Sequence, residues 1–340
     1  MSFSPHRNSP GLPHRSTAMG AVRFGAAAAL AALCSTAVAQ PAAFPVKPMR
    51  LIVGFPAGGG SDALARLLGA ALTEKLGQSV LVENRPGANT IVATEYVRTQ
   101  PPDGYTLLFV SASVAINPSL YKLSYDAEKE FSPISIVAIV PLLLITPNSV
   151  PAKNVMELIA LAKAQPGKLN YASFGLGSSA HLAAEMLLLN TGIEMIHIPY
   201  KGSAPAIQDV LGGRVTMMLA GIGSAINLAR EGKLRALAVS TAKRVPGAPD
   251  IPTIAESGLP GFDVATWESV QAPVGTPAEI VNRLNLSIRD VVGTPELRQK
   301  MVALGFEPDA NRAPAEVAQF IRSERAKWAR VVKERKITVD

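Results

Sequence analysis

The chain has 340 residues, of which 48% are hydrophobic, 17% are charged and 5% are aromatic. This composition is too apolar and too weakly charged for an intrinsically disordered protein. The length allows about two domains that each bury a core. The formal net charge is +7, and the chain has one cysteine.

Residues 1–39 have the three parts of a secretory signal peptide. They contain Arg7, Arg15 and Arg23 and no acidic residue, then the apolar run 24–33 (FGAAAALAAL), then Ala-Val-Ala at 37–39. The apolar run is too short to span a bilayer. We therefore predict cleavage after Ala39 and export to a bacterial periplasm, with either Met1 or Met19 as the true start.

Cleavage changes what the charge and the cysteine mean. It removes three of the 33 basic residues and none of the 26 acidic ones, which leaves a net charge of +4 on 301 residues. That charge does not indicate a nucleic-acid partner. Cys34 leaves with the signal peptide, so disulfides, cysteine zinc sites and a cysteine nucleophile are excluded from the mature chain.

The mature chain opens with alternating strand and helix patterns. Short apolar runs predict strands at 49–55, 79–83 and 106–110. Between them, helical spacing predicts a helix that contains Leu64 to Leu72 and ends at Gly77, and a second helix at 91–98. This order of strands and helices predicts an open, mostly parallel sheet covered by helices.

The same plan starts again near Pro151. Strands are expected at 169–174, 195–199, 215–219 and 234–240, with helices at 155–164, around Leu182, at 204–211 and at 224–230. Helices at 277–292, 295–303 and 314–336 end the chain. The strand-like segments 135–147 and 266–273 are placed to cross between the two units. Two crossings predict a hinged pair of lobes with a cleft between them.

The sequence gives little support for catalysis. Segment 177–181 (GSSAH) lacks the final glycine of the G-x-S-x-G nucleophile motif, and no H-E-x-x-H, EF-hand or P-loop motif occurs. We expect His197, within a strand, to be a hydrogen-bonded core or sheet-end residue. His181, in the first turn of a helix, is equally suited to packing, capping or ligand contact. We predict no catalytic residue, no metal and no cofactor.

Two glycine-rich loops each follow a strand and open a helix, at 58–63 (GGGSDA) and 175–180 (GLGSSA). Both match the G-x-G-x-x-A form of a dinucleotide fingerprint, but Glu194 precedes its strand, whereas the fingerprint needs an acid at the strand's end. A helix N-terminus exposes unpaired N–H groups and the positive end of its dipole. The paired loops therefore favour a clamp for a small anion, of which carboxylate is the first choice; the alternative is that the glycines only make tight turns.

Motifs along the whole mature chain resemble those of the Bug receptors, the Bordetella uptake gene family of solute receptors that serve tripartite tricarboxylate transporters. The first is the segment 45–62 (PVKPMRLIVGFPAGGGSD). The others, in order, are 82–88 (VENRPGA), 102–106 (PDGYT), 116–121 (INPSLY), 171–173 (YAS), 199–202 (PYKG), 209–213 (DVLGG), 232–238 (GKLRALA), 252–253 (PT), 258–262 (GLPGF) and 272–277 (APVGTP).

The resemblance implies a monomeric, two-lobed α/β periplasmic binding protein that is not an enzyme. Each lobe would be a mostly parallel sheet flanked by helices, with 45–138 and 270–340 in domain 1 and 139–269 in domain 2. The receptor would close on a small carboxylate and deliver it to the membrane permease subunits. Carried over by position, the ligand contacts would be Phe55, Ala57, Gly58, Gly59 and Asp62, then Ser111 and Ser113 in a third loop, and Ser173, Gly175, Gly177, Ser178 and His181 in the second lobe.

One departure from the family pattern bears on the ligand. The family often has an aspartate after the strand 215–219, where this chain has Ala220. Without an acid to meet an amine, amino-acid ligands are disfavoured. Two alternatives to a transport receptor stay open at this point: a periplasmic serine hydrolase that uses Ser178 or Ser173, and a sensory receptor that presents its ligand to a histidine kinase.

Overall fold

Three parallel strands form where the apolar runs predict them. In the computed structural model, which describes residue 11 and residues 44–339, β1 (Met49–Val53) lies between β2 (Val80–Asn84) and β3 (Thr106–Ser111). Because the strands are parallel, the segments that follow β1 and β3 lie at the same edge of the sheet. Apart from residue 11, the predicted signal peptide lies outside the described residues.

The helices of this region pack around the three strands. They are α2 (Gly60–Leu76), the 3-10 turn η1 (Ala88–Thr90), α3 (Ile91–Arg98), α4 (Ser113–Leu120) and α5 (Ala127–Glu130). Gly77 ends α2 as predicted, because it adopts the left-handed conformation (φ 67°) and donates its N–H to the Thr73 carbonyl. The prediction of a third loop that holds Ser111 and Ser113 was wrong: Ser111 ends β3 and Ser113 begins α4.

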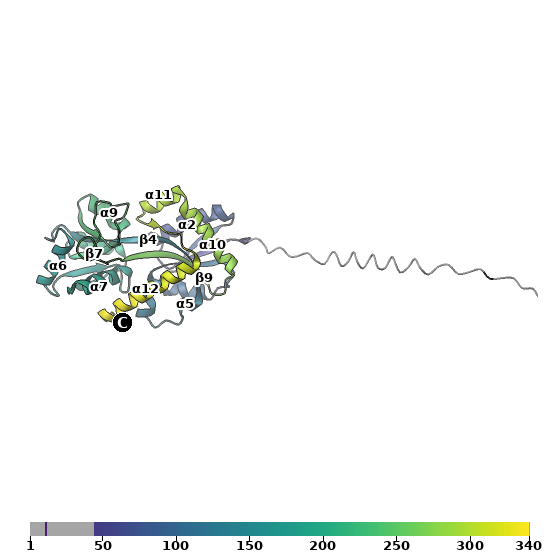
Figure 1. The fold of residues 1–340 in the computed structure, drawn as a ribbon, viewed down its shortest axis with the longest axis horizontal. Coiled ribbons are helices and arrows are strands. Elements are labelled where there is room, and N and C mark those ends of the chain that lie inside the picture. The colour runs from purple at the N-terminus through teal and green to yellow at the C-terminus, as the bar shows by residue number, and fades with distance from the viewer. Residues whose placement is uncertain (1–10, 12–43, 340) are drawn as a thin grey trace, which may run out of the picture. The chain divides into compact units, whose positions relative to one another are not determined.

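One long strand belongs to two sheets. The first part of β4 (Phe131–Pro147) pairs antiparallel with β9 (Ala265–Pro273), which also pairs with β3. Beyond Pro141, β4 pairs instead with β7 (Met217–Gly221) and β8 (Leu234–Val239). Figure 1 shows β4 and β9 running side by side through the middle of the fold. The crossing predicted for 135–147 is therefore present, and it continues through Pro141.

The second sheet has a parallel centre. β5 (Asn170–Ser173) pairs in parallel with β6 (Ile196–Pro199) and β7, while β4 closes the sheet in the antiparallel sense. Its helices are α6 (Val155–Ala164), α7 (Ser179–Thr191), α8 (Ser203–Leu211) and α9 (Ile222–Arg230). We call the region built on β1, β2, β3 and β9 the first half, and the region built on β5 to β8 the second half.

The C-terminal segments return to the first half. They are α10 (Ala278–Gly293), α11 (Pro295–Ala303), the short strand β10 (Glu307–Pro308) beside β4, and α12 (Pro314–Arg335). The apolar stripe of α12 is buried at Val317, Trp328, Val331 and Val332. This helix packs against α4 and β4 and also against α7, so it contacts both halves.

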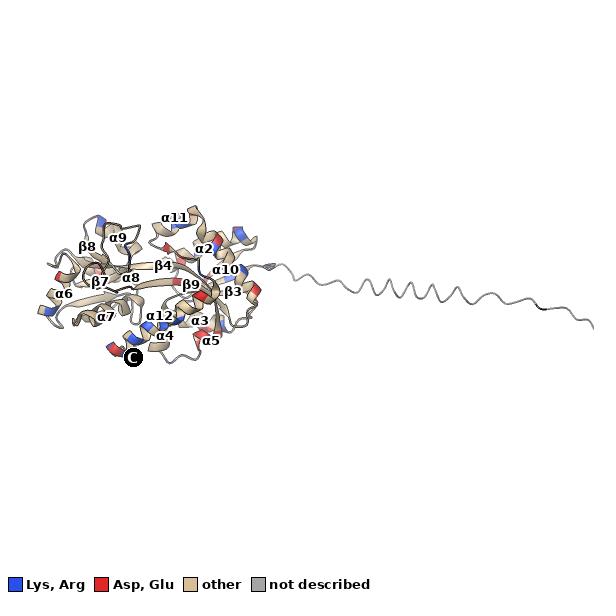
Figure 2. Ribbon diagram, in the orientation of Figure 1, with Lys and Arg blue, Asp and Glu red and all other residues tan. Residues whose placement is uncertain are grey.

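Charged side chains lie mainly on the helices around the sheets. Figure 2 shows lysine and arginine interspersed with aspartate and glutamate on both halves. Arg322, Arg330 and Lys333 on α12 are exposed to solvent. Within residues 44–339, none of the helices combines the length and the apolar character needed to cross a membrane.

Candidate functional site

The segment 54–62, which we call the first glycine loop, joins β1 to α2 and includes the first three residues of that helix. Ala57, Gly58 and Gly59 are exposed, and the N-cap residue Gly59 provides no side-chain oxygen to the first turn of the helix. The first N–H groups of a helix have no partner within the helix, so an uncapped N-terminus is available to an anion. This loop can therefore bind an anion through its backbone.

Asp62 holds the first glycine loop in shape. Its buried carboxylate accepts hydrogen bonds from the Gly58 N–H (2.9 Å), the Asn84 amide (2.8 Å) and the Arg66 guanidinium (3.0 Å). Burial alone would raise the pKa of Asp62, but these bonds together hold that pKa below its usual range. Asn84 also donates to the Phe55 carbonyl at 3.0 Å. The side chain of Asp62 is thus fully engaged within the loop.

The second glycine loop, residues 174–178, joins β5 to the N-terminus of α7. Ser178 is the N-cap residue of α7, accepts the His181 N–H and donates to the Gly175 carbonyl at 2.6 Å. The Gly177 N–H donates to His181 Nδ1 at 3.2 Å. Gly177 has a φ of 72°, a conformation that glycine adopts without strain. Ser178 and His181 therefore fix this loop much as Asp62 fixes the first.

His181 and His197 form a stacked, neutral pair behind the second glycine loop. Their ring centroids lie 3.9 Å apart with planes 7° from parallel. Burial, and secondarily His197, lowers the pKa of His181 to about 3, and burial lowers the pKa of His197 to about 4. At neutral pH His181 therefore supplies no positive charge to a ligand. His197 is hydrogen-bonded, as predicted, through Nε2 to the Ser173 hydroxyl at 2.7 Å.

The contact between Ser173 and His197 does not make a nucleophile. Ser173 is fully buried, and its hydroxyl donates to the Gly175 carbonyl at 3.0 Å. The nearby Glu185 bonds instead to Tyr171 and to Arg335 of α12. A serine nucleophile needs an accessible hydroxyl and a base that a third group orients. The hydrolase alternative, which names Ser173 or Ser178, is thus not favoured.

The turn η1 contacts both the second glycine loop and α4, and no sequence motif indicates these contacts. Asn89 donates from its side-chain amide to Asn117 in α4 (2.7 Å) and to the Gly177 carbonyl (3.3 Å). The neighbouring Thr90 bonds to the Ser113 hydroxyl at 2.7 Å, and Ser113 also accepts from Ser111 at 3.3 Å. Ser111 and Ser113 are thus linked to Gly177 through the adjacent residues Thr90 and Asn89, each of which makes its own hydrogen bond.

Glu268 on β9 is a further residue beside the first glycine loop that no sequence motif indicates. It is buried, and its Oε1 accepts a 2.6 Å hydrogen bond from Ser61 in the first turn of α2. The partner lies 207 positions away, so no local motif could indicate this contact. The only signal in the sequence is a single acid within the otherwise uncharged segment TWESVQAP.

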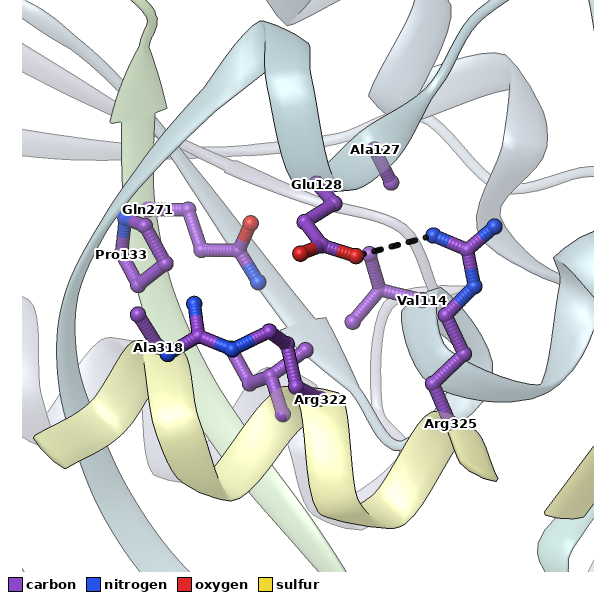
Figure 3. Close-up of a pocket in the computed structure, with 9 residues that line it drawn as sticks. Val114, Ala127, Glu128, Pro133, Gln271, Ala318, Arg322 and Arg325 are labelled. Atoms are coloured by element: carbon purple, nitrogen blue, oxygen red, sulfur yellow. Dashed lines mark hydrogen bonds and ion pairs between the residues drawn. The ribbon is translucent and has the colours of Figure 1, made fainter. Parts of the chain in front are cut away.

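Two pockets on the described residues lie away from the glycine loops. One lies between α12 and the strands β4 and β9, where Arg325 pairs with Glu128 at 3.3 Å and Gln271 is one of the lining residues (Figure 3). The other is lined by residues of α9, β8 and the 248–251 segment. None of the predicted ligand residues lines either pocket. Within residues 44–339, no group of three or more His, Cys, Asp or Glu side chains could hold a metal.

The sequence matches one family model, described as the tripartite tricarboxylate transporter family receptor, over residues 64–337. A protein encoded in the tcbD-tcbE intergenic region of Pseudomonas sp. strain P51 is 37% identical over 325 residues, which cover 95% of this chain and 96% of the relative. Protein BugT of Bordetella pertussis is 38% identical over 294 residues, which cover 86% of this chain and 90% of BugT.

Solved structures with the same fold include three relatives. Rpa4515 of R. palustris, solved with adipate, has a TM-score of 0.79 and 37% identity, with 87% of this chain and 99% of that chain covered. The periplasmic binding protein BugD has a TM-score of 0.76 and 35% identity, with 87% of this chain and 99% of BugD covered. MatC of Rhodopseudomonas palustris, solved with malate, has a TM-score of 0.74 and 33% identity, with 85% of this chain and 100% of MatC covered.

Proposed function

This chain belongs to the family of tripartite tricarboxylate transporter receptors, and from that premise we propose that it captures a small organic carboxylate for transport. The observation that carries the proposal is the pair of glycine loops, each at the N-terminus of a helix and each held in shape by its own side chains. Such N-termini bind carboxylates through backbone N–H groups. The adipate and malate in the solved relatives support the same ligand class.

The ligand binds between the two halves, with contacts from both glycine loops. In the first half these come from Phe55, Ala57, Gly58, Gly59 and Asp62, together with Ser111 and Ser113. In the second half they come from Ser173, Gly175, Gly177, Ser178 and His181. Because the side chains of Asp62, Ser173 and His181 are already engaged with other protein groups, these residues act by holding backbone N–H groups in place.

The chain forms two domains that close over the ligand; they follow the two halves, except that the start of β9 (265–269) falls in the second domain. One domain comprises 45–138 and 270–340, and the other comprises 139–269. Support comes from β4, which pairs in both sheets, and from the Asn89–Gly177 contact, which joins the domains away from that strand. Ligand contacts that exist only in the closed form shift the equilibrium toward it.

The receptor works in the periplasm as a monomer and without catalysis, and it passes its ligand to the membrane permease subunits of a tripartite transporter. The relative BugD is a periplasmic binding protein. Residues 1–39 serve as the signal peptide that directs export. The buried, internally bonded Ser173 supports the absence of a nucleophile.

A thermal-shift screen against organic acids tests the ligand class. The protein is unfolded and refolded first, to remove ligand that co-purifies, and then screened with adipate, malate, succinate, glutarate and citrate. A ligand at 100 times its Kd stabilises a protein by about 2.7 kcal/mol, which gives a clear shift. A shift with a few related carboxylates is expected. No shift with any acid in ligand-free protein would overturn the proposal.

Two glycine variants provide a matched test of the site. Gly177 and Gly192 both have left-handed backbones (φ 72° and 66°), so alanine costs each about 1 kcal/mol of conformational strain. Only at Gly177 would the new Cβ meet a neighbour, Leu120 Cδ1 at 2.8 Å, whereas nothing lies within 4 Å at Gly192. Gly177→Ala should lose the ligand-induced shift, and Gly192→Ala should keep it.

The same screen tests whether the receptor prefers acids without an amine. Ala220 is a buried residue at the end of β7, where it cannot bind an ammonium group. We therefore expect succinate and glutarate to stabilise the protein more than aspartate and glutamate do. A preference for the two amino acids would refute this part of the proposal.

A further inference from the structure

Glu268 is an acid enclosed beside the first glycine loop. Only 3% of the residue is exposed. Its Oε1 accepts the 2.6 Å hydrogen bond from Ser61, the second residue of α2, whereas its Oε2 has no hydrogen-bond partner among the described residues. A buried polar atom without a partner is costly, so in a native protein it calls for an explanation.

The sheet register places Glu268 with the predicted ligand residues. It lies opposite Ser111 of β3 and Ala138 of β4. Directly opposed residues of antiparallel strands project from the same face of the sheet. Ser61 reaches the same carboxyl from the N-terminus of α2, where unpaired N–H groups are available to an anion. The unpartnered oxygen therefore belongs to a carboxyl that borders the first turn of α2, next to the place proposed for a ligand carboxylate.

No charged group of the surrounding elements neutralises Glu268. Strands β3 and β4 contain no ionisable residue. The ionisable groups on helices α2, α3, α7 and α12 make their hydrogen bonds to groups other than the Glu268 carboxyl. On α2 and α3, Asp62 bonds to Arg66, Glu95 to Ser124 and Arg98 to Glu130. On α7 and α12, His181 bonds to Gly177, Glu185 to Tyr171 and Arg335, and Glu324 to Trp267 and Trp328.

These surroundings favour the protonated acid. Burial raises the pKa of Glu268 to about 8, and the hydrogen bond from Ser61 offsets only part of that effect. A protonated carboxyl carries an O–H donor, whereas an anionic carboxyl beside the N-terminus of α2 would repel a second carboxylate. The missing partner of Oε2 is then an acceptor, which a carboxylate ligand provides.

We propose that protonated Glu268 donates a hydrogen bond from Oε2 to a carboxylate oxygen of the ligand, so that above neutral pH the ligand binds together with a proton. The inference rests on the proposed carboxylate-binding function and deepens it. Glu268 becomes a specificity-determining residue that selects an anionic oxygen at this position.

Three variants separate this role from a structural one. Glu268→Gln keeps a donor and an acceptor but cannot titrate, and Glu268→Leu removes the donor. Glu307→Gln is the matched control: Glu307 also has a buried, unpartnered oxygen, but it pairs with Ile139 and so projects from the face opposite to Ala138 and Glu268. Thermal unfolding shows that each variant is folded before binding is measured.

Isothermal titration calorimetry with adipate and with malate, in two buffers of different ionisation enthalpy, counts protons taken up on binding. Near pH 9 the wild type and Glu307→Gln should take up close to one proton per ligand, and both should lose about tenfold in affinity between about pH 7 and 9. Glu268→Gln should take up none and keep its affinity. Glu268→Leu should bind about tenfold more weakly at both pH values.

Several results would overturn the proposal. Equal proton uptake by the wild type and Glu268→Gln would do so. So would tighter binding of aspartate than of succinate, if that preference is lost in Glu268→Gln, because the Glu268 carboxyl would then be an anion that binds the ligand's amine. If neither probe binds wild-type protein, the proposed function fails and this inference fails with it. Ligand-free protein gives a separate readout: its Tm should fall between about pH 6 and 8 in the wild type but not in Glu268→Gln.

Discussion

Thr90 packs against Gly54 at the end of β1, so closely that a Cβ on Gly54 would lie 2.7 Å from the Thr90 Cβ. The preceding residue, Asn89, donates to the carbonyl of Gly177. The turn η1 therefore contacts both the strand that leads into the first glycine loop and the second glycine loop itself. Ala88, Asn89 and Thr90 all have positive φ values, of 43°, 50° and 76°. Such backbones persist only where the surroundings hold them.

Replacing Asn89 separates its backbone role from its side-chain role. Asn89→Gly keeps the left-handed backbone at little cost, whereas Asn89→Ala does not. Both variants lose the side-chain bonds of Asn89 to Asn117 and Gly177 and keep only the bond that its backbone carbonyl accepts from Asn117, so both should bind ligand several-fold more weakly. Only alanine adds backbone strain, so the free energy of unfolding of Asn89→Ala should fall by about 1 kcal/mol more than that of Asn89→Gly. Urea unfolding and calorimetry measure the two effects, and wild-type affinity in Asn89→Gly would show that η1 does not support closure.

A methyl group at Gly223 should hold the two halves apart. Gly223 in α9 lies against the backbone that follows α11, and a Cβ there would lie 2.1 Å from the Leu304 carbonyl oxygen. Because backbone atoms cannot rotate away, Gly223→Ala should force a shift and weaken ligand binding at least tenfold, which corresponds to about 1.4 kcal/mol.

Gly293→Ala is the control for Gly223→Ala, since nothing lies within 4 Å of the new Cβ at the end of α10. It should keep wild-type affinity. Small-angle X-ray scattering of ligand-bound protein should give a larger radius of gyration for Gly223→Ala than for either the wild type or Gly293→Ala. Equal radii and equal affinities would mean that the contact yields locally without opening the halves.

The ion pair between Arg335 and Glu185 joins α12 to the second half. Glu185 is buried and also accepts from Tyr171. Arg335→Met should lower the free energy of unfolding by about 2 kcal/mol, less than for a fully buried pair because Arg335 is partly exposed. Adding Glu185→Gln should restore part of that loss, since no uncompensated charge then stays buried. Urea unfolding of the two single variants and the double variant measures the coupling, and strictly additive effects would contradict it.

The histidine pair should make the protein sensitive to acid. The folded pKa values of His181 and His197, about 3 and about 4, lie below the ordinary value of 6.5. Between about pH 6.5 and 4 the unfolded chain thus binds more protons than the folded one, and the free energy of unfolding falls as pH falls. Each histidine contributes a slope of up to about 1.4 kcal/mol per pH unit.

His197→Gln tests the acid sensitivity, because glutamine still provides hydrogen-bonding groups for Ser173 but does not titrate. Urea unfolding at several pH values from about 4.5 to 7 should give a shallower slope for this variant than for the wild type. Identical slopes would show that another group causes the loss of stability in acid.

Most strands and helices could be predicted from the sequence because their signals are local. The run MRLIV is β1, Gly77 ends α2, and the apolar stripe of α12 is buried. The helix α4 was not predicted, because its sequence SVAINPSL contains a proline and β-branched residues, which do not favour a helix. It forms because Val114, Ala115 and Ile116 are buried in the core and Asn117 bonds to Asn89.

The candidate site was predictable only where it is built from one continuous segment. Each glycine loop follows a strand and precedes a helix, a pattern that can be recognised from residues close together in sequence. Glu268 and Asn89 bond to residues 207 and 88 positions away, so their place depends on the register of β9 and on the contact between the halves. The register of β9 and the contact between the halves depend on the whole fold, so no local sequence pattern encodes them.

The pairing of β3 with β9 also determines when the first half can fold. Ser111 pairs with Glu268, so the inner edge of the first sheet stays open until the chain has been made almost to its last helices. The second half is different: β5 to β8 and their helices come from one continuous stretch, and its contacts are shorter in sequence. Short-range contacts form faster because less chain entropy is lost in closing them. We therefore expect the second half to become structured first during folding, and to serve as the template on which β4 and β9 complete the other half.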